Sequence, residues 1–186
     1  MYGFIFNMKL GKLFFYAWDF ELKQRPSVLT ITPDKLVRYS EFREKTTDIF
    51  GKASVLYAVI RGGRIVDIQN VIVTDTATSQ VAKAEYIPPT SEIFPGQAEA
   101  ILRGMGLLIN RNADRKKCFL TLEGEPGLKS GQVVTLSGFD SGVKDVNPEK
   151  NNDGKWIIVK ATQKLSAQGW FTELELWKVN NTNLTF

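Results

Sequence analysis

Carboxylates near the carboxyl end of this 186-residue chain are the first side chains that could do chemistry. Glu173 and Glu175 lie two residues apart in an alternating run, so a strand places both on one face. Asp140, Asp145 and Asp153 belong to the polar stretch before that run. Two carboxyl groups beside a glycosidic bond are the machinery of most glycoside hydrolases, which makes a cell-wall glycan hydrolase one hypothesis. A solvated strand face predicts the same residues, and we therefore assign no catalytic residue.

Two other motifs fall short of a ligand site. The stretch from Asp140 to Gly154 is rich in oxygen ligands but lacks the spacing and the terminal glutamate of a calcium loop. Lys129-Ser130 follows no glycine and precedes no helical pattern, so a phosphate-binding P-loop is not supported. We expect no metal and no cofactor.

Histidine is absent from the sequence, and cysteine occurs once. The absence of histidine excludes Ser-His-Asp, Cys-His and HExxH chemistry. Cys118 lies in the apolar run CFLTL, where a buried structural thiol is expected rather than a reactive one. A single cysteine also excludes an intrachain disulfide.

Nucleic-acid binding has two candidate sets of residues. One is a set of cations around the end of a predicted helix: Arg111, Arg115, Lys116 and Lys117, with Lys129 and Lys144. Cations at a helix C-terminus also favour the helix dipole, and we prefer that interpretation. The other is a set of aromatic residues, Trp156, Phe171 and Trp177, which would stack bases in an OB-like barrel but which sheet packing explains as well. The net charge of +4 is small for a dedicated DNA-binding protein.

The elements that must position these residues are mostly strands. Between Lys117 and Val179 the apolar, β-rich runs predict four strands: Cys118–Leu122, Val133–Leu136, Trp156–Ala161 and Phe171–Val179. Alternation in the last run predicts that Leu174 and Leu176 face inward. Pro126 and Gly127 indicate a turn, and Gly131 a bend or bulge.

The earlier part of the chain also reads as strands. Phe4–Phe6 and Leu13–Trp18 predict a hairpin turning near Gly11, and charged residues interrupt this region too often for a membrane span or a secretory signal. Further strands are expected over Ser27–Thr32, ended by Pro33, and from Lys35 to Phe42. Ser54–Ile60 and Ile65–Val73 predict a second hairpin, joined by Arg61-Gly62-Gly63-Arg64.

One amphipathic helix of roughly 14 residues follows Gly96. Its buried face is predicted from residues at helical spacing: Ala98, Ile101, Leu102, Met105, Leu108 and Ile109. Gly104 and Gly106 weaken the helix and indicate close packing against a strand or tolerated strain.

These elements predict an α+β protein, mainly β, with two small barrel-like β modules and one amphipathic helix. We expect a β-rich module over 1–75, a polar, proline-punctuated linker over 76–96, a helix plus a barrel-like module over 97–179, and a fraying polar tail over 180–186.

The region from Gln97 to Val179 resembles the baseplate hub family of contractile phage tails, also called late control D or tail hub proteins. The resemblance is carried by the run GEPGLKSGQVVTLSGF and the strands that follow it. The matching positions are Pro126, Gly127, Gly131, Val134, Leu136, Gly138, Phe139, Gly154 and Trp156. The segment YGFIFNMKLGKLFFY looks like the middle of a hub protein, and a complete hub chain is about twice as long as this one.

The resemblance implies a structural, non-enzymatic subunit that forms a trimeric hub between tail tube and central spike. Its implied partners are its own copies, the spike, the tube and other baseplate proteins, with no membrane. Either the chain is a short or split hub whose missing part is another polypeptide, or the resemblance covers a domain used elsewhere. For a partial hub, we expect a second polypeptide to complete the sheet by strand addition at Met1–Phe6. The implied location is the virion tail baseplate, assembled in the host bacterial cytoplasm. The alternative is an OB-like binding module for single-stranded nucleic acid or glycan.

Overall fold

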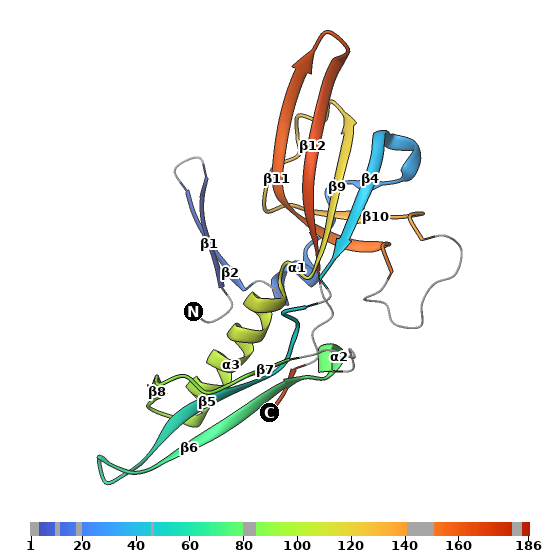
Figure 1. Ribbon diagram of the computed structural model, residues 1–186. Coiled ribbons are helices and arrows are strands. Elements are labelled where there is room, and N and C mark those ends of the chain that lie inside the picture. Colours follow the sequence, from blue (N-terminus) through green and yellow to red (C-terminus); the bar gives the residue numbers. More distant parts are fainter. Residues whose placement is uncertain are drawn as a thin grey trace. The chain divides into compact units, whose positions relative to one another are not determined.

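The computed structural model describes residues 4–9, 12–17, 20–45, 47–79, 85–140, 151–179 and 184–186 (Figure 1). The chain forms two compact units. Unit 1 comprises Met1–Asp19, Lys45–Asn112 and Asn181–Phe186, and unit 2 comprises Phe20–Glu44 and Ala113–Asn180. No helix in the described part of the chain is long and apolar enough to cross a membrane.

Unit 2 is built on a six-stranded sheet in the order β3-β10-β11-β12-β9-β4. Its strands are β3 (Thr30–Ile31), β4 (Leu36–Glu44), β9 (Lys116–Glu123), β10 (Val133–Leu136), β11 (Gly154–Ser166) and β12 (Gly169–Lys178). The end strands β3 and β4 are separated in the chain only by the 3₁₀ turn η1 (Pro33–Lys35), so the sheet must curl into a half-barrel. The predicted strand over Ser27–Thr32 is shorter than expected, and it ends before Pro33 as predicted.

The inside of this curled sheet holds the core of unit 2. Leu174 and Leu176 are buried, as alternation along the strand predicted. They pack in one cluster with Ile31, Cys118, Leu120, Leu122, Leu128, Val134, Leu136, Trp156 and Ile158. Gly131 has a φ of 87°, and its N–H donates to the carbonyl of Ile158 at 2.7 Å. The predicted bend at Gly131 is therefore confirmed.

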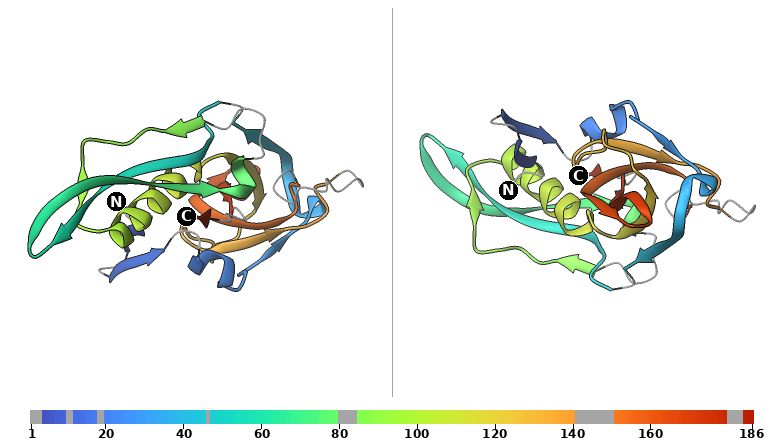
Figure 2. Two further views of the ribbon diagram at one scale, coloured as in Figure 1. Left: turned by 90° about the horizontal axis from the view of Figure 1, so that it is seen from below. Right: turned by 90° about the horizontal axis from the view of Figure 1, so that it is seen from above.

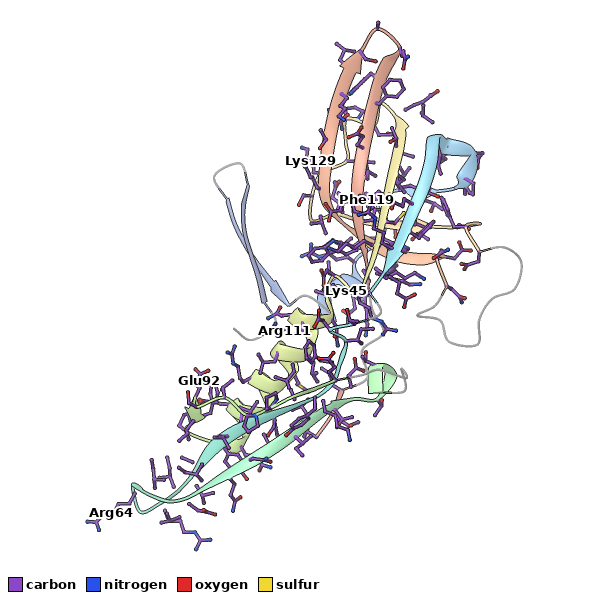
Figure 3. The ribbon with its side chains drawn as sticks, in the orientation of Figure 1. Lys45, Arg64, Glu92, Arg111, Phe119 and Lys129 are labelled. Carbon is purple, nitrogen blue, oxygen red and sulfur yellow. The ribbon has the colours of Figure 1, made fainter. Side chains whose placement is uncertain are left out.

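Unit 1 contains a second sheet in the order β13-β6-β5-β7, with β8 also paired to β5. Its strands are β5 (Phe50–Arg61), β6 (Arg64–Asp75), β7 (Glu85–Ile87), β8 (Ile93–Phe94) and β13 (Leu184–Thr185). The predicted β5–β6 hairpin is confirmed, with antiparallel register from Lys52↔Thr74 to Arg61↔Arg64. Gly62 and Gly63 have φ of 55° and 75°, the values that a tight hairpin turn requires. Figure 3 labels Arg64 at this turn.

The helix α3 (Gln97–Asn112) runs alongside the β5–β6 hairpin (Figures 1 and 2). Its buried residues are Ala100, Gly104, Gly106, Leu108 and Asn112, whereas the predicted face members Ala98 and Leu102 are exposed. The buried stripe is rotated because the helix approaches β6 through Gly104. A Cβ at Gly104 would lie 2.6 Å from Cγ2 of Val73. The predicted close packing of a helical glycine against a strand is confirmed there.

The two units do not follow the sequential division 1–75, 76–96, 97–179 and 180–186. Residues 76–96 contain α2 (Thr76–Ser79), β7 and β8, and both strands pair with β5. In the tail, β13 pairs with Thr74 and Asp75 of β6. The three strands are only two or three residues long, too short for a hydrophobic period to reveal them in the sequence. Backbone pairing and core contacts of Phe94, Ile87 and Leu184 hold them to the sheet.

Two elements remain at the start of the chain. The helix α1 (Phe20–Gln24) belongs to unit 2. The predicted first hairpin is confirmed as β1 (Phe4–Lys9) and β2 (Lys12–Ala17), an antiparallel pair that forms a sheet of its own.

Candidate functional site

The carboxylates considered for catalysis lie in two different places. Glu173 and Glu175 share a groove with Glu41 and Lys160, on strands β12, β4 and β11, so the predicted common face is confirmed. Glu173 pairs with Lys164 at 2.7 Å, and Glu175 accepts a hydrogen bond from Trp177 Nε1 at 3.2 Å. Both side chains have partners of the kind found on a solvated strand face.

The third carboxylate of the groove is also paired. Glu41 accepts a hydrogen bond from Arg43 Nε at 2.6 Å, and this bond lowers the pKa of the Glu41 carboxyl. A general acid requires a raised pKa, so Glu41 has the opposite shift from a glycosidase acid.

The carboxylates of Asp140 and Asp153 accept hydrogen bonds from backbone N–H groups of unit 2. Asp153 accepts the N–H groups of Gly138 and Phe139 at 3.0 and 2.8 Å. Asp140 accepts the N–H groups of Asn152 and Asp153 at 2.6 and 3.1 Å. Neither lines the groove of Glu173 and Glu175, so the predicted combination does not form; Asp145 lies outside the described residues.

Two buried lysines meet the same stretch of backbone. Lys116 Nζ donates to the Asn151 carbonyl at 3.2 Å, and Lys178 Nζ donates to it as well. Burial lowers the pKa of Lys116. Trp156 Nε1 donates to the neighbouring Asn152 carbonyl at 2.9 Å. The backbone at Asn151 and Asn152 is thus tied to strands β9, β11 and β12.

The aromatic set proposed for base stacking is not assembled. Trp156 is 0% exposed in the core of the half-barrel, so no base can reach it. Phe171 and Trp177 are half-buried on β12, and Lys117 Nζ lies 5.2 Å from the Trp177 ring centroid. Stacking platforms must present a ring face, and Trp156 does not.

The basic residues have separate local partners. Arg111 lies over the Phe50 ring at 5.9 Å, and the buried Arg115 faces Glu44 at 3.6 Å. Lys117 pairs with Asp114 at 3.1 Å. Lys129 is exposed, and Lys144 lies outside the described residues. The ring contact of Arg111 and the ion pairs of Arg115 and Lys117 favour the structural interpretation of this cluster over phosphate binding.

Cys118 is a core residue, as predicted. It is fully buried, and burial raises the pKa of its thiol to about 12. Among the described residues, no group of three or more Cys, Asp or Glu side chains is arranged to hold a metal ion.

An exposed apolar surface on the β5–β6 hairpin is the feature that sequence reasoning missed. Val71 and Val73 pack toward α3. Because side chains alternate along a strand, the residues next to them, such as Ile72, lie on the opposite face of the sheet. We call this opposite surface the open face; its apolar members are Leu56, Ala58, Ile60, Ile65, Ile68 and Ile72, with Ile93 of β8. Ala58 is buried and Leu56 half-buried among them, and the exposed Asn70, which pairs with Leu56, is a polar member of the same face. Ile60, Ile68, Ile72 and Ile93 are 44–49% exposed, and Ile65 is 64% exposed. The signal was present in the sequence, because Ile and Val occupy both alternating positions from Ile65 to Val73.

Such a surface is unusual on an isolated sheet. Antiparallel sheets ordinarily bury one apolar face and present a polar face to water. Contiguous exposed apolar patches larger than a few hundred Å² commonly mark interaction sites. The open face is therefore the candidate functional site, because an exposed apolar surface is suited to contact with another protein.

The fold of this chain is also found in phage tail proteins. The 43 kDa tail protein of prophage MuSo2 from Shewanella oneidensis superposes on 97% of the chain with a TM-score of 0.67 and 15% identity. A tail protein from Neisseria meningitidis MC58 covers 95% with a TM-score of 0.61 and 14% identity. A chain from the virion of a native gene transfer agent particle covers 89% with a TM-score of 0.53 and 16% identity. No protein-family model matches the sequence, and no curated protein matches it either.

The chain corresponds to only part of each of these tail and virion proteins. The chain spans 52% and 51% of the first two tail proteins and 34% of the gene transfer agent chain. The likeness covers both units of this chain, and it agrees with the phage tail resemblance that the glycine and strand pattern indicated.

Proposed function

We propose that this chain is a structural subunit of the tail of a phage or phage-like particle. The observation that supports this most is the superposition of 97% of the chain on a prophage tail protein at a TM-score of 0.67. The open face supports it independently, because a subunit of a closed assembly needs apolar surface that the single chain leaves exposed.

Within the tail, we place the subunit in the baseplate as part of a trimeric hub that joins the tail tube to the central spike. Its partners would be its own copies, the spike, the tube and other baseplate proteins, and its location the virion tail. The role is mechanical rather than enzymatic: Glu41, Glu173 and Glu175 are all engaged by neighbouring side chains.

Light scattering coupled to size exclusion tests the ring directly. At micromolar concentration we expect a mass three times the 20.9 kDa of one chain. A monomer at every concentration up to the solubility limit would refute the trimer. An oligonucleotide titration at low and moderate salt supplies the contrast, because steeply salt-dependent binding would favour the OB-like alternative.

A further inference from the structure

We propose that the tip of the β5–β6 hairpin of one copy docks into an apolar groove with an acidic rim on the half-barrel of a second copy. This inference rests on the proposed function, in which copies of the chain assemble into a closed ring. It assigns to one polypeptide both halves of the contact that joins neighbouring copies.

The hairpin tip, residues 60–65, projects beyond α3 (Figures 1 and 2). Ile60 pairs with Ile65, and Arg61 pairs with Arg64. Because side chains alternate along a strand, the isoleucine pair lies on the open face and the arginine pair lies on the other face. Ile60 is 49% exposed and Ile65 is 64% exposed. The tip therefore presents an apolar side and a cationic side.

The arginine pair at the tip is unfavourable on a hairpin in water. Like charges directly opposite each other in an antiparallel ladder repel. Arg61 and Arg64 are exposed, and neither guanidinium has an ion pair or a hydrogen bond within the described part of the chain. A carboxylate from another molecule would relieve the repulsion, since a guanidinium binds a carboxylate through two parallel hydrogen bonds. The tip therefore favours a partner surface that combines apolar and acidic side chains.

Unit 2 carries such a surface in a groove beside η1 and the turn after β9. The floor of the groove is apolar: Leu29 and Leu36 are half-buried, and Leu122 is buried in the core cluster that both of them contact. Val37 also lines the groove and is 41% exposed. The volume of about 450 Å³ lies within the range of roughly 300–1,000 Å³ of pockets that hold small ligands. Side chains of the size of isoleucine and arginine can enter it.

The rim of this groove is acidic. Asp34, Glu123 and Glu125 line it, and all three residues are exposed. No cation among the described residues forms an ion pair with the carboxylate of Glu123 or Glu125. Lys35 lines the groove as well, but its Nζ donates to the carbonyl of Thr30 at 3.0 Å. The rim therefore has an excess of negative charge that can receive the two guanidinium groups of the tip.

Charge pairing distinguishes this groove from the groove of Glu41, Glu173 and Glu175. There Arg43 pairs with Glu41 and Lys164 pairs with Glu173, both within unit 2. A cationic tip would have to displace these side chains before it could bind. Because charge complementarity selects the partner and fixes the register of a contact, the groove of Glu123 and Glu125 is the better acceptor.

A second copy is the occupant that the charges favour, because one polypeptide carries both the cationic tip and the acidic rim. A contact between two different patches of identical subunits is heterologous, and it closes into a ring when the rotation between subunits allows. Ile68 and Ile72 follow the tip along the same open face. Docking of the tip therefore brings the open face against the same neighbouring copy, which covers its exposed isoleucines.

Charge reversal tests this contact in the full chain. Arg61→Glu with Arg64→Glu reverses the tip, and Glu123→Lys with Glu125→Lys reverses the rim. Each double variant places like charges on both sides of the contact, so we expect light scattering to show loss of the trimer and a mass near 20.9 kDa. All four substitutions in one chain make the tip and the rim complementary again, and we expect the trimer to return.

Lys160→Glu with Lys164→Glu is the matched control for reversal of the tip. It changes the net charge of the chain by the same amount at two exposed residues of β11, and it should keep the trimer. The urea midpoint of every variant shows whether the single chain still folds. Arg61→Gln with Arg64→Gln is a milder tip variant, which should weaken the trimer less than charge reversal does.

The outcomes separate this contact from the ring. A wild-type trimer that survives both double variants, or a fourfold variant that stays monomeric, would overturn the docking and leave the proposed function standing. A wild type of another oligomeric state that shows the same loss and recovery would support the docking and refute the trimer. A wild type that is monomeric at every concentration refutes both.

Discussion

Asp140 and Asp153 form a reciprocal pair that joins the backbone just after β10 to the backbone just before β11. Asp153 accepts the backbone N–H groups of Gly138 and Phe139, and Asp140 accepts those of Asn152 and Asp153. Each carboxylate therefore binds backbone next to the other. The arrangement holds the backbone just after β10 next to the backbone just before β11.

Breaking this reciprocal pair should destabilise unit 2. Asp153→Ala leaves two backbone donors without their charged acceptor, and we expect a loss of about 2–4 kcal/mol in the free energy of unfolding. Chemical denaturation measures it. Asp67→Ala is the control, because Asp67 is exposed and bonds to Ile68 and Gln69 beside it. Equal losses in the two variants would contradict the structural role of Asp153.

Local patterns were sufficient for much of the fold. The apolar run Val133–Leu136 predicted β10 with its observed bounds, and Arg61-Gly62-Gly63-Arg64 located the turn of the long hairpin. These features depend on neighbours in the chain. The parallel pairing of Thr135 with Thr30 does not, and nothing near Thr30 in the sequence indicates it. The interleaved units follow from such long-range pairings, which explains why a sequential domain division differed from the observed one.

The candidate site shows the same limit. Alternation placed Glu173 and Glu175 on one face, but only the structure shows Lys164 and Trp177 as their partners. The burial of Trp156 could not be predicted either, because an aromatic residue in a strand gives the same sequence pattern whether it lies in the core or forms a stacking platform. Gly104 lacks a side chain, so hydrophobic periodicity could not include it in the buried face of α3.

The contact between Gly104 and Val73 gives a second test. Gly104→Ala places a Cβ 2.6 Å from Val73 Cγ2, and overpacking should outweigh the gain in helix propensity for a net loss of about 1–2 kcal/mol. Adding Val73→Ala removes the clash, so the double variant should lose less than the sum of the two single losses. Strict additivity in thermal or urea denaturation would contradict a direct contact.

A turn in unit 2 offers a matched pair of glycines. A Cβ at Gly124 would lie 2.3–2.6 Å from ring atoms of Trp170, whereas a Cβ at Gly127 has nothing within 4 Å. Gly124→Ala should therefore displace the indole and cost about 1–3 kcal/mol. Gly127→Ala should stay within about 0.5 kcal/mol of the wild type. Tryptophan fluorescence and denaturation midpoints report both effects, and a reversed order would refute the packing of Trp170 on Gly124.

Cys118 should make stability fall at high pH. Burial raises the pKa of its thiol from 9.0 to about 12, so above pH 9 the unfolded chain loses this proton before the folded chain does. The folded state is therefore favoured fully below pH 9, and this contribution declines by roughly 1.4 kcal/mol per pH unit between the two values. Cys118→Ala removes the thiol, and its stability deficit relative to wild type should shrink from pH 8 to pH 10.5. A constant deficit over that range would contradict the burial of the thiol.

Assembly should depend on the open face and not on exposed apolar residues in general. Ile68 and Ile72 are 49% and 46% exposed, so replacing both by Asp should leave the free energy of unfolding of a single chain within about 1 kcal/mol. The same change places two charges in the centre of the proposed interface, where burying them without partners is costly. We therefore expect a shift from trimer to monomer in light scattering, with a urea midpoint of the single chain that changes by no more than this small loss of stability. Leu102→Asp, which alters an equally exposed residue on α3, should keep the trimer. Loss of the trimer in both variants would mean that hydrophobic exposure, rather than this face, holds the copies together.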